Sequence, residues 1–240
     1  MLSKLASMGR LSVRGKAREP ARDIGRDVRW LLAGLVAVVA WDAAGLDLAV
    51  SRLFADGHGF AWRDQWLFST VLHDGARGLA WVVAAVLIVN VWQPLPFARG
   101  LDRIDRARWL GATLACVIVI PVLKQASLTS CPWSLAEFGG TAVAVSHWLP
   151  GRPDGGAGHC FPAGHPVAAF CFLPGYFVLR RTEPVVARRW LAATVAAGIV
   201  LGAAQLVRGA HFVSHSLWTG WLCWALGLAV VHGTQRRVPA

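Results

Sequence analysis

Residues 159–165, His-Cys-Phe-Pro-Ala-Gly-His, combine two histidines with a glycine-containing turn. The segment stands directly before an apolar run that begins at Pro166, so we expect His165 at or just ahead of a helix start. Unpaired backbone N–H groups and the helix dipole favour an anion at such a position, and an imidazole titrates near neutral pH. The segment therefore predicts phosphate binding combined with proton transfer.

Two more polar clusters, residues 124–133 and 208–215, also fall at the ends of apolar runs. If the apolar runs cross a membrane, counting the crossings brings all three clusters to the same outer surface. Two cations and three imidazoles would then gather there: Lys124, Arg208, His165, His211 and His215. This set fits an anionic substrate, and because it contains no carboxylate it disfavours glycosidase-type or aspartyl chemistry.

The composition indicates how these clusters are positioned. Hydrophobic residues make up 55% of the 240 residues, the mean hydropathy is +0.48, and the chain contains 13 Trp. Several apolar runs approach the roughly 20 residues that a helix needs to cross a bilayer. We therefore expect an all-α, polytopic membrane protein with six transmembrane helices, over residues 30–50, 78–92, 109–123, 166–179, 190–207 and 216–231. They form one domain, 30–240, after a basic cytoplasmic arm, 1–29, in which we recognise no signal peptide.

The net charge of +11 is distributed unevenly along the chain. Most of the 24 Lys and Arg lie in the segments 1–29, 99–108, 180–189 and 236–237, which a six-helix topology places on one side. This asymmetry follows the positive-inside rule and predicts cytoplasmic N- and C-termini in a bacterial cytoplasmic membrane, with the active site at the periplasmic face. The charge therefore marks orientation in a lipid bilayer, and we expect no nucleic-acid partner.

The outer segments raise three structural expectations. Residues 51–76 predict an extracytoplasmic loop with interfacial helix character, and residues 125–161 predict a long structured loop. Asp42, within the first apolar run, either has a partner or water-filled cavity or lies near the outer interface. Cys131 and Cys160 both fall in outer segments, and the sequence leaves open whether they form a disulfide or stay as two free thiols.

Taken together, the three clusters resemble the type 2 phosphatidic acid phosphatases (PAP2), a family that shares a helical core with vanadium haloperoxidases. The family motifs are Lys-x6-Arg-Pro, Pro-Ser-Gly-His and Ser-Arg-x5-His-x3-Asp, and their order and spacing agree with residues 124–132, 162–165 and 204–215. Several positions depart from the family; among them Cys131 and Gln205 replace Arg, Ala163 replaces Ser, and His215 replaces Asp.

The resemblance implies a PAP2-like helical core and phosphoryl transfer without a metal or other cofactor. It implies that His211 attacks phosphorus, that His215 holds the imidazole of His211, and that His165 protonates the leaving oxygen. The groups expected to bind phosphate are Lys124, Arg208 and the backbone at Gly164 and Ala163. Arg77, His73 and His159 are expected to support the site, and we expect His58, His147 and His232 to be surface residues.

The substrate implied is an outer-leaflet lipid phosphate such as undecaprenyl diphosphate, phosphatidylglycerophosphate, phosphatidate or a lipid A phosphate. One alternative is an intramembrane zinc hydrolase, because His211 and His215 have the spacing of two ligands on one helix face. His159, Cys160 or His165 would complete that zinc site, although Lys124 and Arg208 would repel the cation. A second alternative is a non-catalytic lipid-binding or transport protein on a degenerate phosphatase scaffold.

Overall fold

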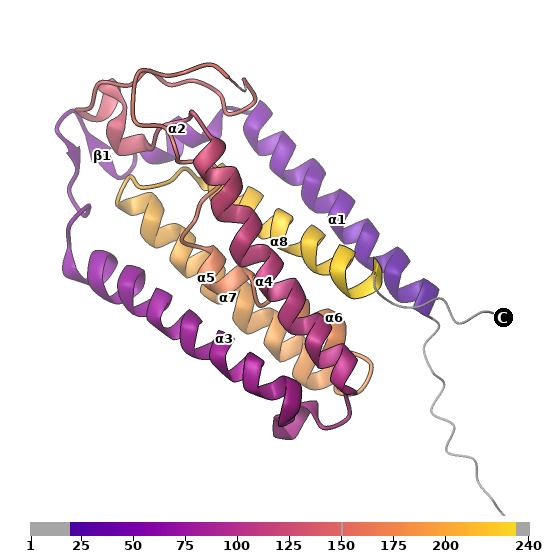
Figure 1. Ribbon diagram of the computed structural model, residues 1–240. Coiled ribbons are helices and arrows are strands. Elements are labelled where there is room, and N and C mark those ends of the chain that lie inside the picture. The colour runs from indigo at the N-terminus through magenta and orange to yellow at the C-terminus, as the bar shows by residue number, and fades with distance from the viewer. Residues whose placement is uncertain (1–19, 150, 234–240) are drawn as a thin grey trace, which may run out of the picture.

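The computed structural model describes residues 20–149 and 151–233, and these residues fold mainly into helices (Figure 1). The long helices are α1 (Pro20–Ala43), α3 (Ala76–Trp92), α4 (Arg103–Ala126), α7 (Pro184–Val207) and α8 (Val213–Gly233). The shorter ones are α2 (Leu46–Ser51), α5 (Val167–Phe170) and α6 (Pro174–Leu179), with a π-helical segment η1 (Leu67–Gly75) and the 3-10 turns η2 (Pro96–Ala98), η3 (Pro132–Ser134) and η4 (Ala136–Phe138). Two short strands, β1 (Ala55–Asp56) and β2 (Gly59–Phe60), pair antiparallel.

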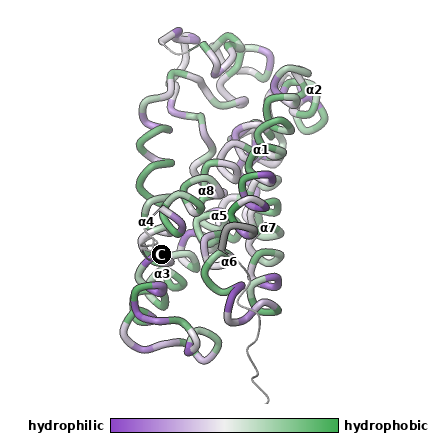
Figure 2. The backbone as a smooth tube through the Cα atoms, turned by 90° about the vertical axis from the view of Figure 1, so that its right-hand side faces the viewer, coloured by the Kyte–Doolittle hydropathy of each residue, from purple (hydrophilic) through white to green (hydrophobic). Residues whose placement is uncertain are grey.

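The core of the bundle lies where α4, α6 and α8 pack against one another. Helix α8 packs against both α1 and α4 (Figure 1), and α4 turns Trp109, Cys116 and Ile120 inward at helical spacing. Phe177 of α6 and Leu228 of α8 close this core. The outward faces of the outer helices are also apolar. Figure 2 shows hydrophobic residues along the helices and more hydrophilic ones at the two ends. An apolar exterior of this kind fits a lipid surrounding.

Three helical segments are long and apolar enough to cross a membrane: Leu67–Trp92, Arg103–Ala126 and Pro184–Val207. The apolar segment Val167–Leu179 is shorter, so the described part of the chain supports a membrane protein, while the count of six spans stays a prediction. The expected boundaries were wrong in several places, and the first predicted span, 30–50, is divided between α1 and α2 at residues 44–45. Residues 67–76 continue α3 as helix rather than forming a loop, and residues 20–29 belong to α1 rather than to the arm. Residues 1–19 of that arm lie outside the described residues.

The fourth predicted span is two short helices rather than one. The chain bends at residues 171–173, between α5 and α6, where Pro174 and Gly175 follow. A Cβ on Gly175 would lie 2.5 Å from Nε1 of Trp190 and 2.7 Å from the ring of Trp109, so the close approach of α7 and α4 requires glycine there. The bend keeps α6 inside the bundle, against α7 and α8.

The two ends of the bundle differ in structure. The basic turns at residues 99–103 and 180–184 lie at one end, where Gly100 faces Thr182. The other end carries α2, β1, β2 and residues 127–149 and 151–165, and we refer to it as the loop end (Figure 1). A separate apolar cluster of Phe60, Phe138 and Phe212 packs there. Because α4 ends and α8 begins at the loop end, all three polar clusters of the sequence lie there.

Candidate active site

At the loop end, a cavity of about 290 Å³ brings together residues from four separate parts of the chain. It is lined by His73, Arg77, Lys124, Cys131, Trp133, Gly164, His165, Gln205, Ala210 and His211. Lys124 comes from the last turn of α4, His165 from the segment before α5, and His211 from the loop between α7 and α8. We call this cavity the phosphate pocket, because it unites two cations with three imidazoles, a combination that could bind and protonate a tetrahedral anion.

His165 is held by the π-helical segment η1. Its Nε2 lies 2.8 Å from the carbonyl oxygen of Leu72, so Nε2 carries the proton and Nδ1 is the nitrogen left for a ligand. The ring of His73 stacks on it at 4.3 Å between centroids. Burial lowers the pKa of His165 to about 4, and the neighbouring cations act in the same direction, so the ring is neutral at pH 7.

His211 lies in the tight loop between α7 and α8. Gly209 begins the turn with φ of 70°, and a Cβ there would lie 2.2 Å from the ring of Phe60, so both backbone and packing require glycine. The side chain of His211 is buried, and its Nδ1 lies 3.3 Å from Sγ of Cys160. Burial is the main cause that lowers the pKa of His211 to about 3, and the positive charge of Lys124 is the second cause. The ring is therefore neutral and keeps a lone pair for nucleophilic attack.

His215 does not hold the imidazole of His211 in the expected way. The two ring centroids are 5.9 Å apart, and both ring nitrogens of His215 lack a hydrogen-bonding partner within the described part of the chain. The ring is instead enclosed by Phe161 and Phe212, at 5.3 and 5.2 Å. The hydrogen bond between the two histidines that the resemblance implied is thus absent among the residues described.

Two other expected ligands, Ala163 and Arg208, and one expected supporting residue, His159, lie differently from their predictions. The backbone N–H of Ala163 donates to the carbonyl oxygen of His215, so it is not available to a phosphate. Arg208 does not line the phosphate pocket, because its Nε donates to the carbonyl oxygen of Arg63 at 2.7 Å. His159 is exposed and does not line the pocket either. These positions follow from the loop backbones, which the sequence spacing does not specify.

Gly164 lies where the sequence predicted it, close to Lys124. A Cβ at this position would lie 3.2 Å from Cδ of Lys124, so the glycine gives the lysine side chain its room beside the pocket. Arg77, on the first turn of α3, also lines the pocket, with two thirds of its side chain exposed. Lys124 is therefore the more enclosed of these two cations.

Gln205 is a pocket residue that sequence reasoning did not select. It is buried, and its Nε2 has no hydrogen-bonding partner among the described residues. An unpaired buried N–H₂ group beside two cations is a suitable donor for a phosphoryl oxygen. The motif could have identified Gln205, because this residue occupies the position of a family arginine. The comparison with the motif treated the change as the loss of a phosphate ligand and did not consider that a neutral amide can donate a hydrogen bond.

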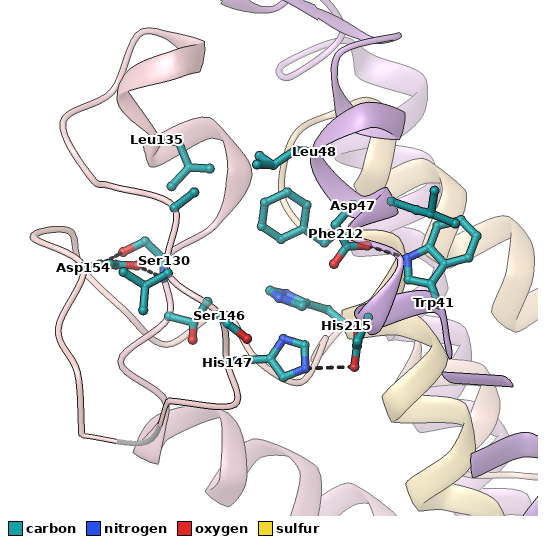
Figure 3. Close-up of a pocket in the computed structure, with 16 residues that line it drawn as sticks. Trp41, Asp47, Leu48, Ser130, Leu135, Ser146, His147, Asp154, Phe212 and His215 are labelled. Atoms are coloured by element: carbon teal, nitrogen blue, oxygen red, sulfur yellow. Dashed lines mark hydrogen bonds and ion pairs between the residues drawn. The ribbon is translucent and has the colours of Figure 1, made fainter. Parts of the chain in front are cut away.

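A second cavity, of about 230 Å³, lies behind His215 (Figure 3). Figure 3 shows His147 beside His215 in this cavity, with Asp47 and Trp41 across from them. Asp42 of α1 also lines it and accepts hydrogen bonds from the side chains of His147, Trp148 and Trp218, at 3.2, 3.1 and 2.8 Å. Asp42 therefore has partners. The expectation that His147 is a surface residue was wrong, since it is half-buried against Phe161.

The geometry of the described histidines and cysteines does not fit the zinc alternative. Among the described residues, one group has ligand atoms within 4.8 Å of one another: Cys131, Cys160 and His211. Its two sulfurs are joined as a disulfide in this structure, so they are not thiolate ligands. The expected second ligand, His215, points its ring into a different set of neighbours. The described residues therefore do not assemble the tetrahedral site that this alternative needs.

The fold and the site define a class: a helical membrane protein with a pocket lined by histidines and cations at one end of its bundle. A profile of the PAP2 superfamily matches residues 106–239, more than half of the chain, and this protein therefore belongs to that superfamily. The family resemblance of the motifs is thus confirmed. No curated protein matches the chain significantly.

A solved structure agrees with this assignment at the level of the fold. The chain is similar to the "first transmembrane PAP2 type phosphatidylglycerolphosphate phosphatase from Bacillus subtilis", with a TM-score of 0.54 and 19% sequence identity. The similarity covers 89% of this chain and 97% of the other. The helical architecture is therefore shared over nearly the full length of both proteins.

Proposed function

We propose that this protein is a membrane lipid phosphatase that hydrolyses a phosphate ester or diphosphate through a phosphohistidine intermediate. The observation that supports this most is the phosphate pocket, in which Lys124, His165 and His211 meet from three separate parts of the chain. Membership of the PAP2 superfamily adds support over the same residues. The pocket supplies a nucleophile, a proton donor and anion ligands, which together are sufficient for phosphoryl transfer.

The proposed reaction has two steps. In the first, the unprotonated ring nitrogen of His211 attacks phosphorus, and the bond from phosphorus to the leaving oxygen breaks. His165 takes up a second proton, at Nδ1, when the phosphate anion binds, and it gives this proton to the leaving oxygen. In the second step, water attacks the phosphohistidine and loses its proton to His165, so that inorganic phosphate leaves and both histidines return to their starting states.

The anion ligands in this scheme differ in charge. Lys124 neutralises a phosphoryl oxygen, and the amide of Gln205 donates a hydrogen bond to another. Arg77 and the backbone at Gly164 complete the pocket, while His73 supports the ring of His165 by stacking. No step requires a metal ion.

An apolar cavity beside the phosphate pocket supports a lipid substrate. The cavity has a volume of about 180 Å³ and shares Arg77, Gly164 and His165 with the phosphate pocket. Apart from Thr113, its other walls are apolar and come from α3, α4 and residues 167–172. They include Trp81 and Leu114, which are exposed on the outer surface of the bundle. A hydrocarbon tail could therefore leave the pocket sideways between α3 and α4 and enter the bilayer.

The proposed setting is the bacterial cytoplasmic membrane, crossed six times, with both termini in the cytoplasm and the loop end in the periplasm. The basic turns support this orientation, because they lie at the end opposite the loop end, as the positive-inside rule requires. The substrate is then a lipid phosphate of the outer leaflet: undecaprenyl diphosphate, phosphatidylglycerophosphate, phosphatidate or a lipid A phosphate.

A panel of these four lipids, assayed for phosphate release by the purified protein in detergent, tests the proposal. We expect release from at least one lipid, inhibition by vanadate, no loss after chelator treatment, and loss of at least about 1,000-fold in His211→Ala. The variant His58→Ala changes an exposed histidine outside the pocket and should keep full activity. Unchanged turnover in His211→Ala would remove His211 from its role. Activity lost to a chelator and restored by zinc would favour the metal alternative, and no release from any lipid would favour a non-catalytic lipid-binding protein.

A further inference from the structure

Cys160 lies against the proposed nucleophile and is held there by its disulfide and by its backbone. Its Sγ is bonded to Cys131, and its backbone N–H donates to the carbonyl oxygen of Thr129 at 3.0 Å. The same sulfur lies 3.1 Å from the carbonyl oxygen of Ala210 and 3.3 Å from Nδ1 of His211. Cys160 is fully buried, so no solvent competes for these contacts.

The chemistry of the sulfur determines where the proton of His211 must be. A sulfur in a disulfide carries lone pairs and no hydrogen, so it can accept a hydrogen bond but cannot donate one. A favourable contact at 3.3 Å therefore needs the N–H of His211 on Nδ1. This tautomer leaves the lone pair on Nε2, the nitrogen that attacks in the proposed reaction.

The residue expected to fix this tautomer does not do so. His215 is 5.9 Å away between ring centroids, and its nitrogens have no partner in the described ranges 20–149 and 151–233. The backbone carbonyl of Cys160, in contrast, also lies near the His211 ring and favours its protonation. The sulfur of Cys160 is therefore the group that contacts Nδ1 of His211.

We propose that Cys160, fixed by its disulfide to Cys131, is the positioning residue for His211 and selects the tautomer that attacks phosphorus. This inference rests on the proposed function. The disulfide removes the S–H group that would otherwise compete as a donor, and it prevents rotation of the sulfur away from the ring. Reduction of the disulfide therefore lowers turnover, because the ring of His211 then samples both tautomers.

Two matched double variants separate the acceptor from the disulfide. Cys131→Ala/Cys160→Ser and Cys131→Ala/Cys160→Ala both lack the disulfide and differ by one hydroxyl. That hydroxyl can donate to the carbonyl of Ala210 while accepting from Nδ1 of His211. We expect the serine variant to retain about five- to tenfold higher kcat than the alanine variant, with similar KM, on whichever lipid phosphate the wild type hydrolyses. A reductant should lower kcat of the wild type and leave both variants unchanged.

The tautomer itself is read by ¹⁵N NMR of histidine-labelled protein, with the His211 signals assigned by comparison with His211→Gln. We expect the proton on Nδ1 in the wild type and a mixture of tautomers in the alanine variant. Equal kcat in the two double variants, or a wild-type ring protonated on Nε2, would overturn the inference. The NMR measurement on wild type needs no activity, so failure of the proposed function and failure of this inference are distinguishable.

Discussion

Lowering the pH from 7 to 5 should destabilise this protein through His211, independently of any effect on catalysis. The pKa of the ring is lowered by burial from an ordinary value of 6.5 to about 3. Below pH 6.5 the unfolded chain takes up a proton that the folded protein refuses. The stability that neutral His211 contributes is therefore fully present above pH 6.5 and is lost as the pH falls toward 3.

The size of the effect follows from proton linkage. Between the two pKa values, the free energy of unfolding falls by about 1.4 kcal/mol for each pH unit and each such histidine. Integrated from pH 7 to pH 5, His211 accounts for about 2 kcal/mol, since titration of the unfolded chain begins only near pH 6.5. In a chain of this size, about 2 kcal/mol corresponds to a Tm decrease of roughly 4–8 °C.

Thermal unfolding in detergent, followed by tryptophan fluorescence, measures this decrease. His211→Gln removes the titrating ring, so its Tm should fall by roughly 4–8 °C less than that of the wild type between pH 7 and pH 5. His58→Gln changes an exposed histidine and should keep the wild-type pH dependence. An identical pH dependence in wild type and His211→Gln would refute the idea that burial keeps His211 neutral.

Two further predictions concern single side chains. Lys124→Met removes the more enclosed cation of the phosphate pocket and should lower kcat/KM by about 100-fold. Arg152→Met removes an exposed cation outside that pocket and should change kcat/KM less than about threefold. A steady-state assay on the hydrolysed lipid compares the two variants. Asp42→Ala leaves the donors of His147, Trp148 and Trp218 without their acceptor and should lower the free energy of unfolding by about 2–4 kcal/mol. Asp64 is exposed, so Asp64→Ala should lower it by about 0.5 kcal/mol. Denaturation in detergent measures both values. Equal losses within either pair would contradict the roles assigned to Lys124 and Asp42.

The convergence of Lys124, His165 and His211 was predictable because it depends on topology. Each residue follows or precedes an apolar run, and helices that run the length of one bundle must bring alternate ends to the same side. The spacing of the motifs then selected those positions among many other polar residues near helix ends. This prediction did not require correct boundaries, so it was unaffected by the errors at residues 67–76 and in the fourth span.

The contacts inside the site were less predictable, because they depend on loop backbones. The motif spacing predicted a hydrogen bond between His215 and His211. In the structure, the turn at Gly209 places the ring of His211 against Cys160 instead. Likewise, the role of Asp42 depends on residues more than 100 positions away, such as His147, which no periodicity connects to α1. A resemblance transfers positions along the chain, but the direction of a side chain follows from packing that is specific to this sequence.

The two arginines that this chain lacks, at Cys131 and Gln205, bear directly on the acid. Fixed cations lower the pKa of a neighbouring histidine, as Arg208 and Arg77 already do for His165. Two more arginines in the pocket would lower the pKa of His165 further. With neutral residues at these positions, fewer positive charges offset the negative charge of the bound substrate. A bound phosphoryl group then raises the pKa of His165 and supplies the condition under which the ring can act as an acid. We infer that the exchange weakens binding of the phosphate group but leaves the proton transfer intact, so its cost falls on KM rather than on kcat.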